Sequence, residues 1–360
     1  MPMTVVSGRF STAFLPTGFS SLSRLRSVKY AAQRRVVFVS KSAHASSSVS
    51  VSVSVAETNS NQVDSVIEKE TKNRGEKKIL ACPICYNSLA WISPPNGFVE
   101  STASSGTQLQ CNTCKRGYSG NETHLDLAVA SGTEQYSEPM PLSTELFRTP
   151  LVSFLYERGW RQNFIWGGFP GPEKEFEMAK DYLKPVLGGN IIDASCGSGM
   201  FSRLFARSQL FSLVVALDYS ENMLRQCYEL LNQEENFPNK EKLVLVRADI
   251  ARLPFLSGSV DAVHAGAALH CWPSPSSAVA EISRVLRPGG VFVATTFIYD
   301  GLFSFIPFLK NFRQEIMRYS GAHVFLSERE LEDLCTACGL VGFTRVRNGP
   351  FIMLSATKPR

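Results

Sequence analysis

The 360-residue sequence predicts an α/β protein: a doubly wound, mainly parallel seven-stranded sheet, preceded by a small cysteine-rich module. Three observations predict this class. Between residues 145 and 360, short apolar runs alternate with stretches of helical period, which is typical of a parallel sheet covered by helices on both faces. Glycine pairs end two of the helical stretches. Two C-x-x-C motifs precede this region and predict the separate module.

Each element has its own local signal. Strands are expected at residues 190–194, 213–218, 243–249, 260–265, 291–297, 341–347 and 351–357, and helices at residues 173–187, 200–208, 220–234, 276–286 and 327–338. Gly188 and Gly189 stop the first helix, and Ser220 caps the third. Ser327 and Glu330 form a capping-box pattern. The last two strands flank a turn and form a closing antiparallel pair.

Residues 1–56 are predicted to be a transit peptide. They carry seven lysines and arginines, fourteen serines and no acidic residue, and their first eight residues are uncharged, which favours the plastid over the mitochondrion. The alternative is a basic disordered tail of a cytosolic protein. Residues 57–78 are polar and charged, and we expect a linker there.

The charge of the rest of the chain disfavours nucleic acid as a general partner. Subtracting the seven charges of the leader from the total of +5 leaves −2 for residues 57–360, so the overall basic balance that phosphate binding requires is lacking. No run of 18 apolar residues occurs, and no transmembrane segment is therefore expected.

Residues 79–128 are predicted to form a zinc-ribbon-like module. Cys82, Cys85, Cys111 and Cys114 supply four thiolates at a spacing suited to tetrahedral Zn²⁺. The alternatives are a redox disulfide pair or a ribbon that no longer binds metal. A third C-x-x-C, Cys335 and Cys338, lies in a helical apolar stripe and is expected to serve packing only.

The most informative stretch begins at the strand 190–194. It runs through Asp193 into a turn with Gly197 and Gly199 and then into a helix, an arrangement in which backbone approaches a ligand closely. The next strand ends in Asp218, an acid suited to the hydroxyls of an adenosine ribose. The nicotinamide pattern G-x-G-x-x-G fails because Ser202 occupies its third position. Asp193 instead suits a ligand with a positive centre, such as a sulfonium.

Residues 190–300 resemble class I S-adenosylmethionine-dependent methyltransferases, especially the branch that methylates quinones. The matching motifs are Asp193–Gly199, Val214–Asp218, Arg247–Asp249, Val260–Val263 and Leu286–Val291. The whole chain is similar to a group of plant chloroplast methyltransferases that pair this domain, residues 145–360 here, with a cysteine-rich module. Such modules also resemble the zinc ribbon of a bacterial ribosomal RNA guanine methyltransferase.

The resemblance implies a role for each site residue. The cofactor-binding set would be Asp193, Ser195, Gly197, Gly199, Asp218, Tyr219, Met223, Asp249 and Ile250. Within it, Asp193 would organise the turn and face the methionine amino group, Asp218 would accept from both ribose hydroxyls, and Asp249 from the adenine amino group. Ser195 departs from the family because a glycine is usual there.

The acceptor side is expected at the end of the fourth strand. His270 is the candidate general base, since the ordinary pKa of histidine lies near neutrality; alternatively, His264 and His270 only pack beside the cofactor. Residues 147–170 and 298–325 are rich in aromatic side chains and suit an apolar or ring-shaped acceptor, although many of these aromatics would simply pack a helical cap.

These features give a leading function and two alternatives. The leading one is methylation, in the plastid stroma or at plastid lipid bodies (plastoglobules), of a small apolar or aromatic molecule such as a prenyl quinone, with peripheral contact to lipid bodies or membranes. The second is methylation of RNA, with the zinc ribbon binding the RNA. The third is ligand binding without catalysis by a protein of the same fold. An Asn-Pro-Pro-Tyr type motif is absent, which disfavours DNA adenine.

Overall fold

A computed structural model of the chain describes residues 79–93, 108–131, 149, 164–165, 167–234, 237–298 and 324–360. The described residues belong to one compact unit. The predicted transit peptide (1–56), the linker (57–78) and most of the aromatic segments 147–170 and 298–325 lie outside the described residues. Within the part described, no helix has the length and apolar character needed to cross a membrane.

The sheet of the larger part has the predicted doubly wound order. Its seven strands run β7-β6-β5-β8-β9-β11-β10, and the first five are parallel. β11 lies antiparallel to β9, and β10 pairs antiparallel with β11. The strands are β5 (Asn190–Ala194), β6 (Leu213–Asp218), β7 (Leu243–Arg247), β8 (Val260–Ala265), β9 (Leu286–Phe297), β10 (Val341–Asn348) and β11 (Phe351–Thr357). The strand order runs outward from β5 to β6 and β7 on one side and to β8 and β9 on the other, so the switch point lies at the carboxyl ends of β5 and β8.

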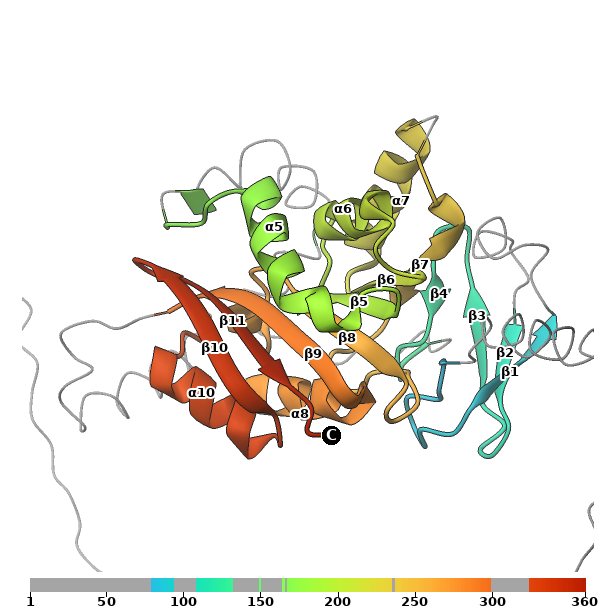
Figure 1. The fold of residues 1–360 in the computed structure, drawn as a ribbon. Helices are drawn as coiled ribbons and strands as arrows, with labels where there is room; N and C mark the ends of the chain where they lie inside the picture. Colours follow the sequence, from blue (N-terminus) through green and yellow to red (C-terminus); the bar gives the residue numbers. More distant parts are fainter. Residues whose placement is uncertain are drawn as a thin grey trace, which may run out of the picture. The chain divides into compact units, whose positions relative to one another are not determined.

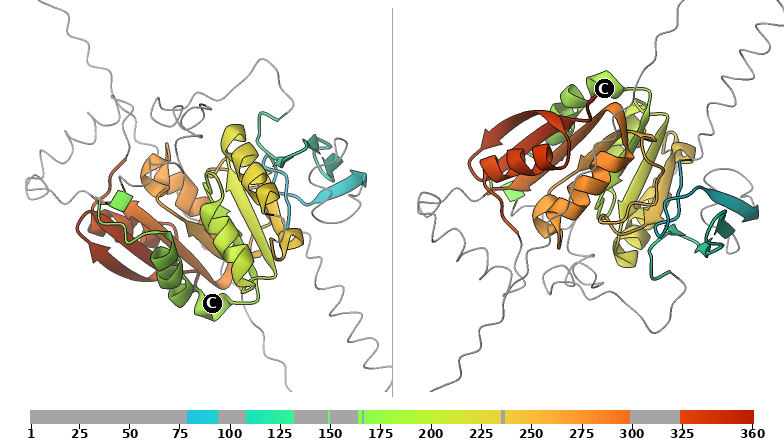
Figure 2. Two further views of the ribbon diagram at one scale, coloured as in Figure 1. Left: turned by 90° about the horizontal axis from the view of Figure 1, so that it is seen from above. Right: turned by 90° about the horizontal axis from the view of Figure 1, so that it is seen from below.

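Helices cover both faces of this sheet (Figures 1 and 2). One layer holds α5 (Pro172–Leu183), α6 (Met200–Ser208) and α7 (Glu221–Gln233), and the other holds α8 (Pro275–Val285) and α10 (Glu328–Ala337). Short 3₁₀ turns occur at η2 (Lys184–Val186), η3 (Lys240–Lys242) and η4 (Leu269–Cys271). The predicted caps are present: Ser220 accepts from the Met223 N–H, and Ser327 and Glu330 form a complete capping box.

Alternate residues of the strands build two cores. Ile192 and Val215 face the core shared with α8 and α10, whereas Ile191 and Val214 face the core under α5, α6 and α7. This period of two places a buried row on each side of every central strand, as a doubly covered sheet requires. Cys335 of α10 is buried in the first core and Cys338 packs against it, as predicted, so this C-x-x-C serves packing.

Several bounds differ from the sequence prediction: the first helix ends at Leu183 instead of residue 187, and the third strand ends at Arg247 instead of residue 249. The difference with a clear physical reason lies between the fourth helix and the next strand. The fourth helix was expected to continue to residue 286, with the next strand from 291, but α8 ends at Val285 and β9 begins at Leu286. Val260 of β8 pairs with Leu286, and after a shift of register Ala262 pairs with Val291. The Pro-Gly-Gly segment is therefore an irregular part of the strand, because pairing with β8 outweighs its local preference for a turn.

The cysteine-rich residues form a small antiparallel sheet of their own. β1 (Leu89–Ser93), β2 (Gln108–Cys111), β3 (Gly117–Gly120) and β4 (Leu125–Asp126) pair in sequence order. β4 then lies parallel to β7, with Leu125 opposite Val246 and Asp126 opposite Arg247. The module thereby extends the large sheet to eleven strands, and its buried side chains share one core with Val246, Ile250 and Phe255.

Candidate functional site

The carboxyl ends of β5 and β6 bring a glycine-containing loop and an acid together. Asp218, the last residue of β6, accepts hydrogen bonds from the Gly197 N–H and the Ser220 N–H, each at 2.9 Å. Burial raises the pKa of the Asp218 carboxyl, although the N–H groups of Ser220 and Gly197 oppose this. The carboxylate is thus held in place by two backbone donors at the carboxyl end of β6, one strand away from the switch point of the sheet.

The loop after β5 has an unusual backbone. Ser195, Gly197 and Gly199 have φ values of 56°, 57° and 80°, all in the left-handed region. Gly199 is the N-cap of α6, and a Cβ placed there would come within 2.1 Å of the Cys227 Sγ on α7. Glycine at this position is therefore required both by conformation and by the close approach of α7.

Ser195 takes the left-handed conformation at the position where the resemblance leads us to expect glycine. Its Oγ accepts a hydrogen bond of 2.9 Å from the indole N–H of Trp272, which is buried. Trp272 follows η4, so this bond joins the loop after β5 to the loop after β8. A positive φ is uncommon for a residue other than glycine, so the bond to Trp272 helps to hold Ser195 in this conformation.

Asp193 lies at the centre of a buried polar cluster. Its side chain is 2% exposed; Oδ1 lies 2.8 Å from the His264 Nδ1, and Oδ2 accepts from the Ser202 hydroxyl at 2.6 Å. His264 is fully buried, and among the described residues its Nε2 has no hydrogen-bond partner. Asp193 is therefore held by its own protein neighbours, which fixes the start of the loop.

The remaining predicted cofactor residues lie along the same edge. Tyr219 follows Asp218 directly, and Met223 is buried in the first turns of α7. Asp249 follows β7, and its Oδ1 accepts from the Ala251 N–H at 2.8 Å. Ile250 is almost fully buried. The nine predicted residues thus lie at the carboxyl ends of three adjacent strands, β5, β6 and β7, or in the loops and first helical turn that follow them.

His270 lies in η4, beyond the end of β8, among aromatic rings. Its Nδ1 lies 3.0 Å from the Thr296 Oγ1. Its ring stacks on Phe325 and meets Phe297 edge to face, with centroid distances of 5.6 and 5.3 Å. Phe297 in turn contacts Phe164 and Phe169. The described parts of the two aromatic segments therefore meet around His270, next to the cofactor edge of the sheet.

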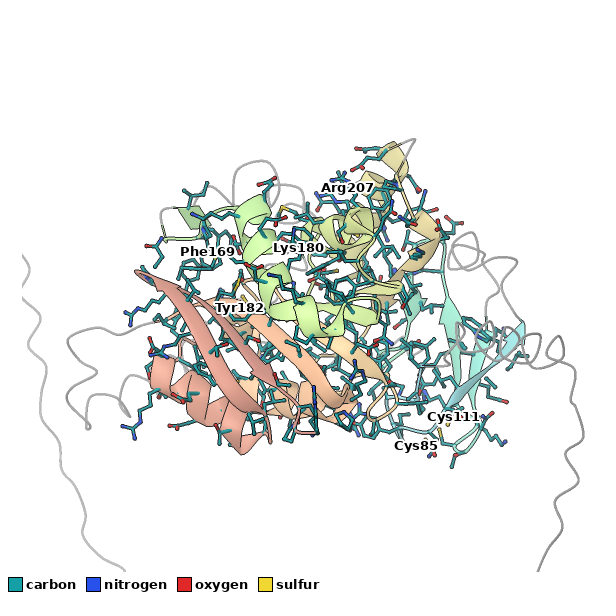
Figure 3. The ribbon with its side chains drawn as sticks, viewed as in Figure 1. Cys85, Cys111, Phe169, Lys180, Tyr182 and Arg207 are labelled. Atoms are coloured by element: carbon teal, nitrogen blue, oxygen red, sulfur yellow. The ribbon has the colours of Figure 1, made fainter. Side chains whose placement is uncertain are left out.

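The four cysteines of the module converge on one point. The ligand atoms of Cys82, Cys85, Cys111 and Cys114 all lie within 4.8 Å of one another (Figure 3 labels Cys85 and Cys111). The Sγ atoms of Cys82 and Cys114 are 3.6 Å apart, and those of Cys85 and Cys111 are 3.4 Å apart. A tetrahedron with Zn–S bonds of about 2.3 Å has edges of about 3.8 Å. The set therefore fits one tetrahedral metal ion and forms no disulfide.

Neighbouring groups are arranged to stabilise thiolates. The N–H groups of Ile84 and Thr113 point at the Sγ atoms of Cys82 and Cys111, each at 3.4 Å. The buried Tyr118 hydroxyl lies 3.1 Å from the Cys82 Sγ. Hydrogen bonds from Asn87, first from its backbone, lower the pKa of Cys85 to about 6. At Cys114, a hydrogen bond from the Arg116 backbone is outweighed by burial and the neighbouring thiols, which raise the pKa to about 11. Such donors favour the charged form of sulfur that a metal binds.

Comparison with known proteins agrees with this arrangement. Residues 192–294 match the methyltransferase domain family. An uncharacterized chloroplastic methyltransferase of Arabidopsis thaliana is 89% identical over 359 residues, covering 100% of both chains, and a second is 45% identical over 350 residues, covering 96% of this chain and 95% of that one. The demethylmenaquinone methyltransferase of Desulfitobacterium hafniense is 25% identical over 270 residues, covering 69% of this chain and 99% of that one.

The fold and the matched domain define a class I methyltransferase, the class that takes its methyl group from S-adenosylmethionine. The chain belongs to the methyltransferase family that includes the two Arabidopsis proteins.

Sequence reasoning did not identify several partners of the site residues. It missed Ser202 and Trp272, which hold Asp193 and Ser195, and it missed Arg247, which donates to the Tyr219 carbonyl. Arg247 lies in one of the motifs, but nothing local distinguishes an arginine that ends a strand from one that faces solvent. These contacts join residues 9 to 77 positions apart, so no periodic signal could have predicted them.

Proposed function

We propose that this methyltransferase holds the adenosyl half of S-adenosylmethionine at the carboxyl ends of β5, β6 and β7 and methylates a small, apolar or aromatic acceptor in the chloroplast. One observation carries the cofactor site: the Asp218 carboxylate lies against the Gly197 N–H, so the ribose-binding acid and the loop meet. The names of the two Arabidopsis relatives support the chloroplast.

Each residue then has a defined task. The Asp218 carboxylate accepts from the ribose hydroxyls, and Tyr219 lines the same end. Met223 and Ile250 provide apolar surfaces for the adenine ring, and Asp249 accepts from its amino group. Ser195, Gly197 and Gly199 shape the loop around the methionine part. Asp193, whose oxygens contact the Ser202 hydroxyl and the His264 ring, fixes the start of the loop and supplies a negative charge for the methionine amino group.

Methyl transfer requires little from the protein beyond alignment. The cofactor supplies a methyl carbon already activated by positively charged sulfur. The aromatic rings around His270 orient a flat or apolar acceptor and exclude water. The Thr296 Oγ1 lies 3.0 Å from the His270 Nδ1 and orients the ring. His270 is then the group that takes the acceptor's proton.

A binding experiment tests the cofactor site. Calorimetry should detect S-adenosylmethionine binding to the wild-type chain, and Asp218→Asn should weaken it on the order of 100-fold, because two hydrogen bonds to a charged group are lost. Asp181→Asn is the control, since its exposed carboxylate pairs with Lys184 on the surface of α5. An unchanged affinity for Asp218→Asn would exclude this site.

The acceptor is tested with labelled cofactor and chloroplast extract. We expect the label in a lipid-soluble small molecule, a prenyl quinone being the candidate that the Desulfitobacterium relative supports, and we expect the protein to sediment partly with plastid lipid bodies. His270→Ala should then slow transfer to this acceptor, with cofactor affinity preserved. Label in RNA would favour an RNA methyltransferase instead, and no label in any fraction would favour a binding protein.

We also propose that the four module cysteines hold structural Zn²⁺. The fit to a tetrahedron and the donors aimed at sulfur support this. Metal analysis of the chain purified in reducing buffer should give one zinc per chain, and Cys82→Ala should lose it. Absence of zinc from the wild-type chain under these conditions would contradict the proposal.

A further inference from the structure

We propose that the cysteine-rich module is a positioning element for the cofactor site: it fixes the two chain segments that would surround the adenosine. This inference rests on the proposed cofactor site. Three sets of contacts carry it: one through Asp126 and Arg247, one between residues 79–81 and the loop 248–256, and one through Tyr86 and Arg284 to the same loop.

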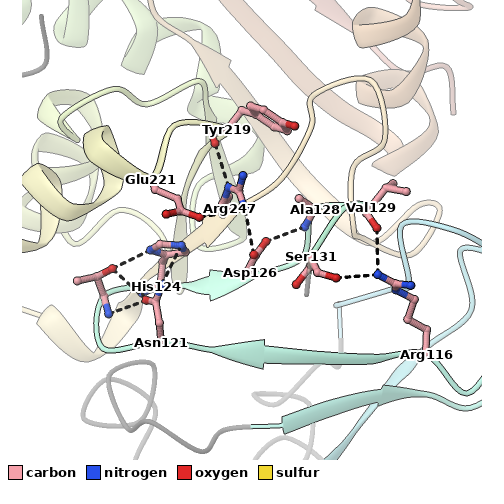
Figure 4. Close-up of polar contacts among 11 residues, drawn as sticks. Arg116, Asn121, His124, Asp126, Ala128, Val129, Ser131, Tyr219, Glu221 and Arg247 are labelled. Atoms are coloured by element: carbon pink, nitrogen blue, oxygen red, sulfur yellow. Dashed lines mark hydrogen bonds and ion pairs between the residues drawn. The ribbon is translucent and has the colours of Figure 1, made fainter. Parts of the chain in front are cut away.

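The first set is a chain of polar contacts centred on Arg247 (Figure 4). The Arg247 Nη1 lies 3.0 Å from the Asp126 Oδ2 of the module and 3.1 Å from the Glu221 Oε1 of α7. Its Nε donates to the Tyr219 carbonyl at 3.2 Å, and its guanidinium lies over the Tyr219 ring at 5.3 Å. Tyr219 follows Asp218, so the module acts on the ribose-binding end of β6 through Arg247.

The Arg247 side chain has a fixed orientation because little of it is exposed. Its relative exposure is 15% and that of Asp126 is 18%. The other oxygen of Asp126 accepts from the Ala128 N–H at 3.1 Å, and β4 itself is paired with β7. A half-buried ion pair between two fixed backbones restricts a side chain far more than a surface pair does.

The second set holds the loop that carries Asp249 and Ile250. Leu80 forms an antiparallel bridge with Phe255. The Ala81 N–H donates to the Pro254 carbonyl and the Leu256 N–H to the Ile79 carbonyl, both at 2.8 Å. Residues 254–256, at the end of the loop, therefore pair like a strand with residues 79–81 of the module. Residues 79–81 directly precede the first C-x-x-C motif, which begins at Cys82.

The first C-x-x-C motif holds the same loop, residues 248–256, through the third set of contacts. The Tyr86 ring lies 4.1 Å from the Arg284 guanidinium of α8. Arg284 donates to the carbonyls of Leu253 and Phe255, both at 2.8 Å. Tyr86 follows Cys85 directly. The four-cysteine cluster therefore fixes the position of the Tyr86 ring, and through Arg284 this ring helps to fix the loop 248–256.

The test is a cofactor-binding comparison on the full chain with S-adenosylhomocysteine as the probe, combined with zinc analysis. Asp126→Ala should raise the dissociation constant about tenfold while zinc remains at one per chain. Asp126→Glu, which keeps the carboxylate, should recover most of the affinity. The control is Asp261→Asn, which breaks a half-buried pair with Arg287 at the opposite, amino-terminal edge of the sheet and should leave the dissociation constant unchanged.

Two further measurements separate positioning from general loss of structure. If Asp126 acts through Arg247, the effects of Asp126→Ala and Arg247→Ala on the dissociation constant will not add in the double variant. Tyr86→Ala should increase amide hydrogen exchange in residues 248–256, whereas Tyr86→Phe, which keeps the ring, should not. Tyr86→Ala also provides the binding test should Asp126→Ala fail to fold.

The outcomes distinguish this inference from the proposed function. A wild-type chain that does not bind S-adenosylhomocysteine would overturn the cofactor site itself. A wild-type chain that binds it, with Asp126→Ala and Tyr86→Ala within twofold of that affinity, would leave the site intact and overturn the positioning role of the module.

Discussion

At the scale of single residues, the half-buried Ser195 and the buried His124 each make side-chain hydrogen bonds within the fold. Ser195 holds a left-handed backbone and accepts from Trp272, so its hydroxyl compensates for a conformation that costs a non-glycine residue about 1 kcal/mol. His124 is buried in the module, with its Nδ1 2.7 Å from the Thr123 Oγ1 and its Nε2 3.3 Å from the Asn121 Nδ2. Each of these two residues leads to a prediction about the free energy of unfolding.

Ser195→Ala should be less stable than Ser195→Gly, the reverse of the usual order in regular structure. Both variants leave the buried Trp272 N–H without its acceptor, at a cost of about 1–3 kcal/mol. Alanine additionally keeps the left-handed strain, which glycine relieves. Denaturant unfolding of the two variants checks the order, and greater stability of the alanine variant would contradict this account.

Stability should fall as the pH decreases below about 6.5, in part because of His124. Burial lowers the pKa of His124 in the folded chain, against the opposing effect of Asp126 and Glu221. The unfolded chain therefore binds this proton at a higher pH than the folded chain does, and acid favours unfolding. Between pH 8 and 5, the free energy of unfolding should fall less steeply in His124→Gln than in the wild type. The same dependence on pH in both proteins would show that His124 does not contribute to the loss.

At the scale of elements, the contact between α6 and α7 depends on the glycine that begins α6. Gly188 and Gly199 share a left-handed φ, 84° and 80°. Nothing lies within 4 Å of a Cβ built on Gly188, whereas one built on Gly199 would meet the Cys227 Sγ at 2.1 Å. An alanine at Gly188 would therefore have backbone strain alone, whereas an alanine at Gly199 would have the same strain and a steric clash as well.

Gly199→Ala should therefore destabilise the chain more than Gly188→Ala. The Gly188 variant carries only the cost of the backbone conformation, about 1 kcal/mol. The Gly199 variant adds the displacement of α7, typically another 1–3 kcal/mol. Thermal unfolding of the two proteins measures the difference, and equal losses would show that α7 moves aside freely.

The same scale shows what the sequence could and could not predict. β5, α6, β6 and β8 have the expected bounds because strand and helix periods change sharply at glycine or at a cap. β4 was not predicted, since Leu125 and Asp126 are too few to show any period. Its pairing with β7 depends on residues 121 positions away. For the site, motif spacing indicated the loop and the acids, but the hydrogen bonds that hold them are tertiary.

At the scale of the whole molecule, the module and the large sheet share one hydrophobic core and one set of strands. Leu109, Leu125 and Leu127 of the module are buried in the core that also contains Val246 and Phe255. A chain without the module would expose both these residues and the unpaired edge of β7. Exposed apolar edges of this kind are sites of aggregation.

Deletion of residues 1–131 should accordingly give a protein that aggregates or binds a hydrophobic dye. Deletion of residues 1–56 is the matched control and should give a monodisperse protein, because it leaves the module in place. Size-exclusion chromatography distinguishes the two, and a well-behaved, stable protein after the longer deletion would contradict the shared core.

The parallel pairing of β4 with β7 also constrains the order of events when the chain is made. Asp126 leaves the ribosome 121 residues before its partner Arg247, an interval of about 6 to 24 s at usual elongation rates. The four cysteines can come together early in synthesis. Leu125 and Leu127, however, remain exposed to solvent until β7 has been synthesised. This interval is when the nascent protein most needs a chaperone.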